Sequence, residues 1–122
     1  MRTLYDFLID EIFIGFLKQS PTLMKEITGF KSELQIIDHQ LVFTLPALFE
    51  LTCQLFEKDH SSAPSRSRSD YLQFRKQLYS NPTNTLLQKQ GGIVEIETSE
   101  MNHDDSIYKL ICISRNNGAS NL

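Results

Sequence analysis

The stretch GGIVEIETSEMNHDDSIYKLICIS, from Gly91 to Ser114, contains the clearest pattern in the sequence. Strand-forming residues cover 93–99 and alternate there with acidic ones, and a second run rich in Ile, Tyr and Leu covers 107–114. Two such runs on either side of a polar segment predict a β-hairpin with its turn over 101–106. The second run is apolar on both faces, which predicts a central or covered strand.

A second hairpin is predicted upstream, in the stretch ELQIIDHQLVFTL. Its strands would cover Glu33–Ile37 and Leu41–Leu45, with the turn at Asp38-His39-Gln40. We expect the four strands of the two hairpins to form one antiparallel sheet.

The first helix is predicted over residues 4–18. Thr3 suits the N-cap, and Asp6 falls three residues later, where an acidic side chain completes the cap. The segment that follows is apolar on nearly every side, with only four charged residues. A helix of this kind is normally buried on more than one side, so it is either the central core helix or a homo-oligomer contact.

Proline and glycine mark the remaining helices. Ser20-Pro21 and Asn81-Pro82 each resemble an N-cap followed by proline at the first helical position, and Pro46 suits the first turn of another helix. A further helix is predicted over Asp70–Tyr79. The fold class predicted is therefore α+β: a single domain over residues 1–115 with four to five helices, two hairpins and one antiparallel sheet with helices on one face. Residues 60–69 are expected to form a flexible loop, and residues 116–122 a disordered tail.

Composition and motifs argue against several classes of function but do not identify one. The 122 residues are 40% hydrophobic, which suits a globular core. The two cysteines stand far apart in apolar runs and are expected to be buried thiols. No metal-ligand spacing, phosphate loop or nucleophile motif is present, so we expect no cofactor, no metal and no enzymatic activity. The N-terminal apolar stretch is too short to span a bilayer, and we expect a cytoplasmic protein with no membrane partner.

Charge is distributed unevenly although the net charge is only −3. Residues 66–89 contain five Lys or Arg and one Asp, whereas residues 93–114 contain five acids and one Lys. The acidic hairpin therefore suits electrostatic steering toward a basic partner. The partner-binding residues predicted are Glu95, Glu97, Asp104 and Asp105. The function predicted is that of a small interaction protein that binds another macromolecule through a charged surface, and an inhibitor of the antitoxin or immunity-protein kind is its most concrete form.

The basic segment supports an alternative. On a helix, Tyr71, Arg75 and Tyr79 share one stripe, where aromatic rings and a guanidinium could stack on bases or hold a phosphate. The hairpin that follows would then be a wing. The nucleic-acid contacts predicted on this alternative are Arg66, Arg68, Tyr71, Arg75, Lys76 and Tyr79. An acidic wing would be repelled by a phosphate backbone, which disfavours the alternative. The other interpretation is that the basic helix and the acidic hairpin neutralise one another within the fold.

Overall fold

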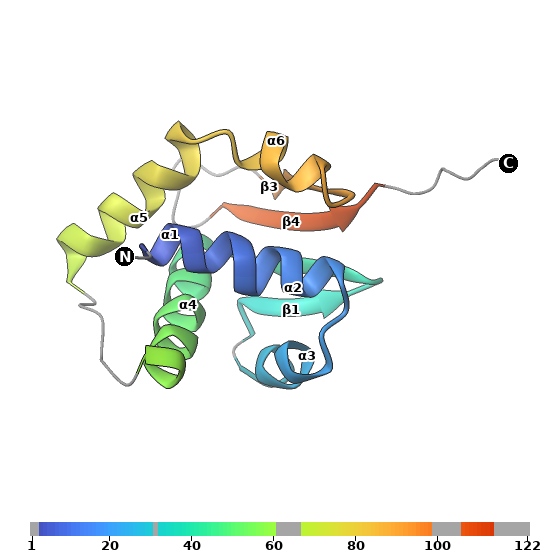
Figure 1. The fold of residues 1–122 in the computed structure, drawn as a ribbon, viewed down its shortest axis with the longest axis horizontal. Coiled ribbons are helices and arrows are strands. Elements are labelled where there is room, and N and C mark those ends of the chain that lie inside the picture. The colour runs from blue at the N-terminus through green and yellow to red at the C-terminus, as the bar shows by residue number, and fades with distance from the viewer. Residues whose placement is uncertain (1–2, 31, 61–66, 99–105, 114–122) are drawn as a thin grey trace, which may run out of the picture.

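The computed structural model describes residues 3–30, 32–60, 67–98 and 106–113. Four strands form one antiparallel sheet in the order β1-β2-β4-β3, with helices on one face (Figure 1). The strands are β1 (Leu34–Ile37), β2 (Gln40–Phe43), β3 (Gly92–Thr98) and β4 (Ile107–Cys112). The predicted α+β class and the central position of the last strand are therefore confirmed.

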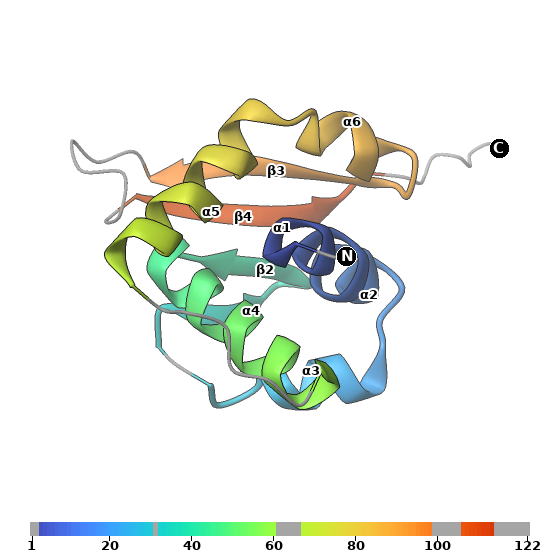
Figure 2. The same cartoon turned by 60° about the vertical axis from the view of Figure 1, so that its left-hand side comes forward.

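The helices occupy the positions that proline and capping residues indicated, with small shifts at their ends. They are α1 (Leu4–Phe7), the π-helical turn η1 (Leu8–Phe13), α2 (Ile14–Leu17), α3 (Pro21–Ile27), α4 (Leu45–His60), α5 (Arg68–Ser80) and α6 (Thr83–Gln88). The segments α1, η1 and α2 are continuous and form the N-terminal helix (Figure 1). Figure 2 shows this helix, α4 and α5 in front of the sheet, on its helical side.

The π turn follows from the spacing of the apolar residues in the N-terminal helix. Buried side chains recur every four residues, at 5, 9 and 13 and at 8, 12 and 16. A regular α-helix has 3.6 residues per turn, so a four-residue stripe would wind around it. A π turn has about 4.4 residues, because its hydrogen bonds join residues five apart, and it therefore rotates the apolar stripe back toward the core. Here the N–H of Ile14 donates to the carbonyl of Ile9.

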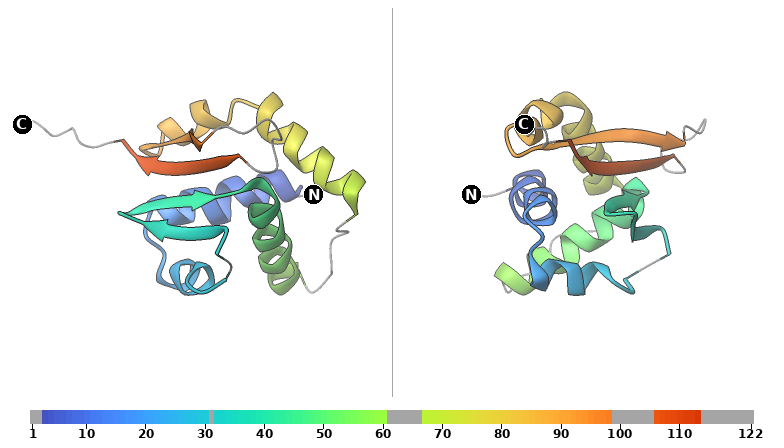
Figure 3. Two further views of the ribbon diagram at one scale, coloured as in Figure 1. Left: turned by 180° about the vertical axis from the view of Figure 1, so that it is seen from behind. Right: turned by 90° about the vertical axis from the view of Figure 1, so that its right-hand side faces the viewer.

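The strand register divides the sheet into two faces. Leu41, Leu110 and Val94 lie opposite one another across β2, β4 and β3, as do Phe43, Tyr108 and Ile96. Among these, Leu41, Phe43, Leu110 and Tyr108 are buried against the helices. We call this the covered face. The opposite side, the open face, carries alternate residues, and no described helix lies over it in the rear view (Figure 3, left).

The apolar side chains of the N-terminal helix belong to the hydrophobic core of the chain. Leu8, Ile12 and Phe13 are fully buried, and Phe13 packs against Phe43 of β2. The burial of these side chains supports the first of the two interpretations of this helix, the central core helix. A homo-oligomer through residues 4–18 stays a prediction, with Asp6, Asp10, Glu11 and Lys18 as exposed residues of the helix.

Two predicted helix boundaries are wrong. Helix α5 begins at Arg68, within the segment expected to be a loop, because Ser67 caps it by accepting a hydrogen bond from the N–H of Asp70 at 3.1 Å. Asn81 does not cap α6. Its side chain instead donates to the carbonyl of Gln77 at 2.8 Å and so closes the end of α5. The rest of the predicted loop, at 61–66, and the predicted tail at 116–122 lie outside the described residues.

The hairpin turn between β1 and β2 consists of two residues, Asp38 and His39. Both have positive φ angles, of 51° and 65°. A two-residue turn with this geometry matches the right-handed twist of its strands, and Asp and His enter the left-handed region more readily than most residues. The turn is one residue shorter than predicted because Gln40 pairs with Ile37 as the first residue of β2.

Candidate functional site

The acidic residues of β3 lie on the open face, next to the lysine of β4. Glu95 is directly opposite Lys109 in the register, and the Lys109 Nζ donates to Glu97 Oε1 at 2.9 Å. This hydrogen bond, with the negative charge of Glu97 and more weakly of Glu95, raises the pKa of Lys109, although partial burial acts in the other direction. The hairpin therefore balances part of its own negative charge with Lys109, and Glu95 remains exposed beside that pair.

Aliphatic side chains take five of the other positions on the open face, and Gln35 and Gln40 take two more. By strand alternation this face carries Ile37 of β1, Val42 of β2, Ile93 of β3, and Ile107 and Ile111 of β4. A hollow of about 200 Å³ lies there, with Ile37, Val42 and Ile107 among its lining residues. The five aliphatic residues, which we call the aliphatic row, are interspersed with Gln35, Gln40 and Lys109. An antiparallel sheet with one face in water normally carries polar residues there, so five aliphatic residues on the uncovered side are more than expected.

Two of the four predicted partner-binding residues are therefore placed by the structure. Glu95 and Glu97 are exposed side by side on one face, as alternation predicted. Asp104 and Asp105 lie outside the described residues, in the turn of the same hairpin. The aliphatic row next to the two glutamates was not predicted, because the sequence does not show which face of a sheet the helices cover.

Fewer side chains of the basic helix α5 are exposed for nucleic-acid binding than its sequence suggested. The ring of Tyr71 is only 6% exposed and packs edge-on against Phe49, with ring centroids 5.4 Å apart. The guanidinium carbons of Arg68 and Arg75 each lie 5.8 Å from the centre of that ring. Tyr71, Arg75 and Tyr79 lie on one helix as predicted, but the burial of Tyr71 leaves little of its ring exposed to stack on a nucleic-acid base.

Two other members of the predicted nucleic-acid surface, Lys76 and Tyr79, are exposed on α5. Lys76 is exposed, and Tyr79 is 54% exposed but shares a hydrogen bond between its hydroxyl and that of Tyr108. Arg66 lies outside the described residues. Nucleic-acid binding through Arg66, Arg68, Arg75 and Lys76 stays a prediction, as does neutralisation of this helix by the acidic hairpin.

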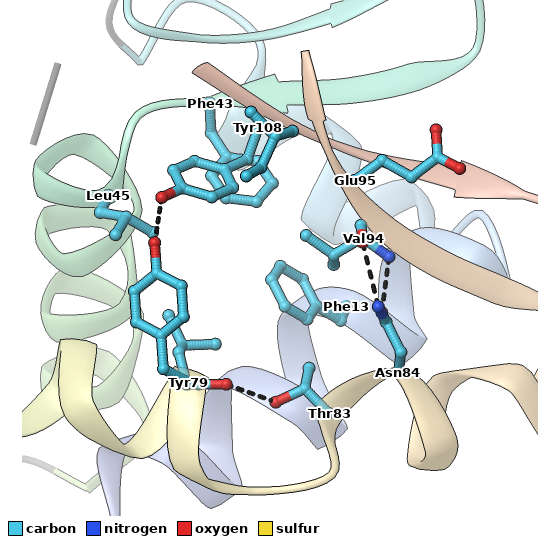
Figure 4. A pocket seen from close by; sticks show the side chains of 11 residues that line it. Phe13, Phe43, Leu45, Tyr79, Thr83, Asn84, Val94, Glu95 and Tyr108 are labelled. Carbon is cyan, nitrogen blue, oxygen red and sulfur yellow. Dashed lines mark hydrogen bonds between the residues drawn. The ribbon is translucent and has the colours of Figure 1, made fainter. Parts of the chain in front are cut away.

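A cavity of about 180 Å³ lies on the covered face, between the β3 edge of the sheet and the junction of α5 with α6 (Figure 4). Its walls include Phe13, Phe43, Leu78, Val94 and Ile96. Figure 4 shows the linked hydroxyls of Tyr79 and Tyr108 along one wall and the side chain of Asn84 bonded to Val94 along another.

The polar residues of the cavity wall were not anticipated. Thr83 is buried, and its hydroxyl is 2.7 Å from that of Tyr5 and donates to the carbonyl of Leu78 at 3.1 Å. Asn84 pairs with both backbone groups of Val94. Both residues follow Pro82 in the first turn of a short helix, where Thr and Asn are ordinary, so their spacing alone carries no signal of a cavity.

The prediction that both cysteines are buried is wrong for one of them. Cys53 is fully buried on α4, whereas Cys112 is exposed at the end of β4. Cys112 lies opposite Gly92, which has no side chain to cover it, and it is the last residue of the strand.

Neither a metal centre nor a membrane span is found in the described part of the chain. No group of three or more His, Cys, Asp or Glu side chains is placed there to hold a metal ion. None of the helices among residues 3–30, 32–60, 67–98 and 106–113 has the length and hydropathy that crossing a bilayer requires.

Comparison with known proteins gives no further indication. No family model matches the chain, and no curated protein or solved structure is significantly similar to it. The site therefore has to be interpreted from its own geometry.

Proposed function

We propose that the chain is an interaction protein that binds a basic protein partner through the open face of its sheet. The observation that carries the proposal is the continuity of the aliphatic row with Glu95 and Glu97 on a face that no described helix covers. Exposed apolar surface bordered by charge is typical of protein-binding sites, since it combines desolvation energy with orientation.

Charge defines the chemistry of the partner. The open face carries two glutamates and one lysine, and the lysine is already bonded to Glu97. Glu95 is exposed on the same strand, and the whole chain has a net charge of −3. A partner with Lys or Arg around an apolar centre would satisfy both parts of this surface, and its association would be accelerated by long-range attraction.

An inhibitor of the antitoxin or immunity-protein kind is the most concrete form of this function. Such a protein needs a small, stable scaffold and an acidic surface that covers a basic, nucleic-acid-directed surface of its target. Charge and size support this form. An inhibitor of this kind needs no active site of its own.

The test is affinity capture with the chain and two charge-matched variants. The double variant Glu95→Gln with Glu97→Gln removes two negative charges from the open face. The control, Asp10→Asn with Glu11→Gln, removes two from the exposed side of the N-terminal helix. The proposal predicts a basic partner that the native chain and the control retain and the open-face variant loses. Equal retention by both variants would exclude the open face as the binding surface.

Salt dependence provides a second measurement on the same partner. If the acidic residues steer association, the association rate constant should fall as ionic strength rises, and the fall should be smaller for the open-face variant. The same dependence in the native chain and the open-face variant would contradict steering by Glu95 and Glu97.

A further inference from the structure

We propose that the outer edge of β3 binds an extended segment of the partner as an added strand, with one apolar side chain of that segment entering the cavity beside Ile96. The inference rests on the proposed function in one respect, the basic character of the partner. It adds the binding mode, the position of the contact and a sequence pattern for the segment.

The edge of β3 is open beside the cavity. β3 is a terminal strand of the sheet, and within the described residues no other strand pairs with its outer side. The N–H and carbonyl of Val94 point outward, since both are bonded to the side chain of Asn84 rather than to β4. Alternation turns the N–H and carbonyl of Ile96 to the same outer side, where they match the hydrogen-bonding groups of an incoming strand.

Asn84 fixes where an added strand can begin. Its amide donates to the Val94 carbonyl at 3.1 Å and accepts from the Val94 N–H at 2.8 Å, as a residue of a neighbouring strand would. The edge is therefore already satisfied at Val94 and open at Ile96, directly before the register of β3 shifts between Ile96 and Thr98. This arrangement limits the contact to a short segment and fixes its register.

The cavity lies directly beside the open part of this edge. Ile96 is 55% exposed and Tyr79 54% exposed, and both line the cavity. Large apolar side chains with this exposure are suited to contact with another apolar group. An engineered protein cavity of about 150 Å³ holds one benzene molecule, so a cavity of about 180 Å³ is large enough for one Leu or Phe side chain.

Strand geometry gives the segment a pattern. In an antiparallel pair, residues directly opposite share a face, and the next residue on either side points to the other face. The residue opposite Ile96 would therefore point to the cavity, and its two neighbours would lie on the open face, one beside Glu95 and the other toward Glu97, where the register of β3 shifts. Lys or Arg suits those two positions, and the segment has the pattern basic–apolar–basic. Strand addition of this kind takes affinity from main-chain hydrogen bonds and specificity from such alternating side chains.

The experiment uses synthetic peptides with free ends blocked and the core Lys-Leu-Lys, titrated into the full chain by fluorescence anisotropy. N-methylation of the Leu amide removes the donor that would bond to Ile96 but leaves charge and side chain unchanged. The matched control carries the methyl group on the following Lys, whose amide points away from β3. The proposal predicts that methylation at Leu weakens binding by about tenfold or more and that methylation at Lys has little effect.

Two further comparisons test the cavity through a change in the peptide and the edge through a change in the chain. Replacing the peptide Leu by Ser should weaken binding by about tenfold or more, because a polar side chain gains nothing from an apolar cavity. In the chain, Ile96→Pro removes an outward N–H that β4 does not use and also the Ile96 side chain at the cavity, so it tests both contacts together, and proline is tolerated on such an edge. It should lower affinity for the native peptide, and circular dichroism would check that it folds.

The outcomes separate this inference from the proposed function. Equal binding of the peptide methylated at Leu and its control, or no binding of the Lys-Leu-Lys peptide at all, would overturn strand addition at this edge. In that case the basic partner would still bind the open face, and Glu95→Gln with Glu97→Gln would still weaken its capture. If those two substitutions changed neither peptide affinity nor partner capture, the proposed function itself would fail.

Discussion

The side chain of Asn84 occupies the backbone hydrogen-bonding groups of Val94, donating to the carbonyl at 3.1 Å and accepting from the N–H at 2.8 Å. The two bonds join α6 to the edge of the sheet in a partly buried position. We expect Asn84→Ala to lower the free energy of unfolding by about 1–3 kcal/mol, because two backbone groups lose their partners. Urea denaturation would measure the change.

Asn81→Ala is the matched control for this prediction. The side chain of Asn81 makes one exposed hydrogen bond, from its amide to the carbonyl of Gln77. Its loss should cost less than about 1 kcal/mol, since water can replace an exposed partner. Equal costs for the two substitutions would show that the Asn84 contact does not hold α6 against β3.

Gly92 lies against Leu17 of the N-terminal helix. A Cβ atom at position 92 would be 2.5 Å from Cδ1 of Leu17, which is too close for any real contact. We expect Gly92→Ala to destabilise the chain by about 1–3 kcal/mol through overpacking. Leu17→Ala should relieve part of that cost in the double variant, and a double-mutant cycle from urea denaturation would measure the coupling.

Gly29→Ala controls for the backbone effect of removing a glycine. Gly29 has a φ of 78° and no atom within 4 Å of the added Cβ. Its substitution should cost stability through conformation alone. If Leu17→Ala also relieved the loss of stability caused by Gly29→Ala, the steric explanation for Gly92 would be refuted.

The ion pair between Lys109 and Glu97 has a definite pH dependence. The hydrogen bond to Glu97 and the charge of that residue raise the pKa of Lys109 in the folded state. A raised folded-state pKa gives a stabilisation that is complete below the ordinary lysine pKa and is lost as pH rises through the raised value. The stability difference between the native chain and Glu97→Gln should therefore be constant near neutral pH and shrink in strongly alkaline solution. Urea denaturation across that range would measure it, and a constant difference would contradict the pairing.

The two thiols should differ in reactivity. Cys112 is exposed and Cys53 is fully buried, so a thiol reagent such as Ellman's reagent should modify one thiol rapidly in the native chain and the second only on unfolding. Cys112→Ser should abolish the fast phase, whereas Cys53→Ala should leave it. Two fast thiols in the native chain would contradict the burial of Cys53.

Local patterns predicted the elements well because their causes are local. Alternation predicted a strand over 93–99, and the structure has β3 at Gly92–Thr98, with residue 99 outside the described residues. The predicted cap at Thr3 is confirmed by a hydrogen bond from the N–H of Asp6 to the Thr3 hydroxyl at 3.1 Å. The misassigned Asn81 shows the limit of such rules. Its amide reaches the helix behind it as easily as the one ahead, and only the packing of α5 decides between them.

The candidate site was only partly predictable because it depends on which face of the sheet the helices cover. Regular alternation places Glu95 and Glu97 on one face, and in the structure both lie next to Lys109, Glu95 opposite it and Glu97 bonded to it. The aliphatic row beside them joins residues from four strands, and the cavity at Ile96 joins two helices to the sheet. Contacts between residues so far apart in sequence produce no local pattern from which a single sequence could predict them.

The π turn between Leu8 and Phe13 has a consequence for how the chain tolerates changes in length. A π turn contains about one residue more than an α turn, so removing one residue there could convert it to ordinary α-helix. The flanking segments α1 and α2 would keep their hydrogen bonds, and only the rotation of α1 relative to α2 about the helix axis would change. A single-residue deletion within this turn should therefore be less damaging than one within α4, where every later side chain would leave its place in the core.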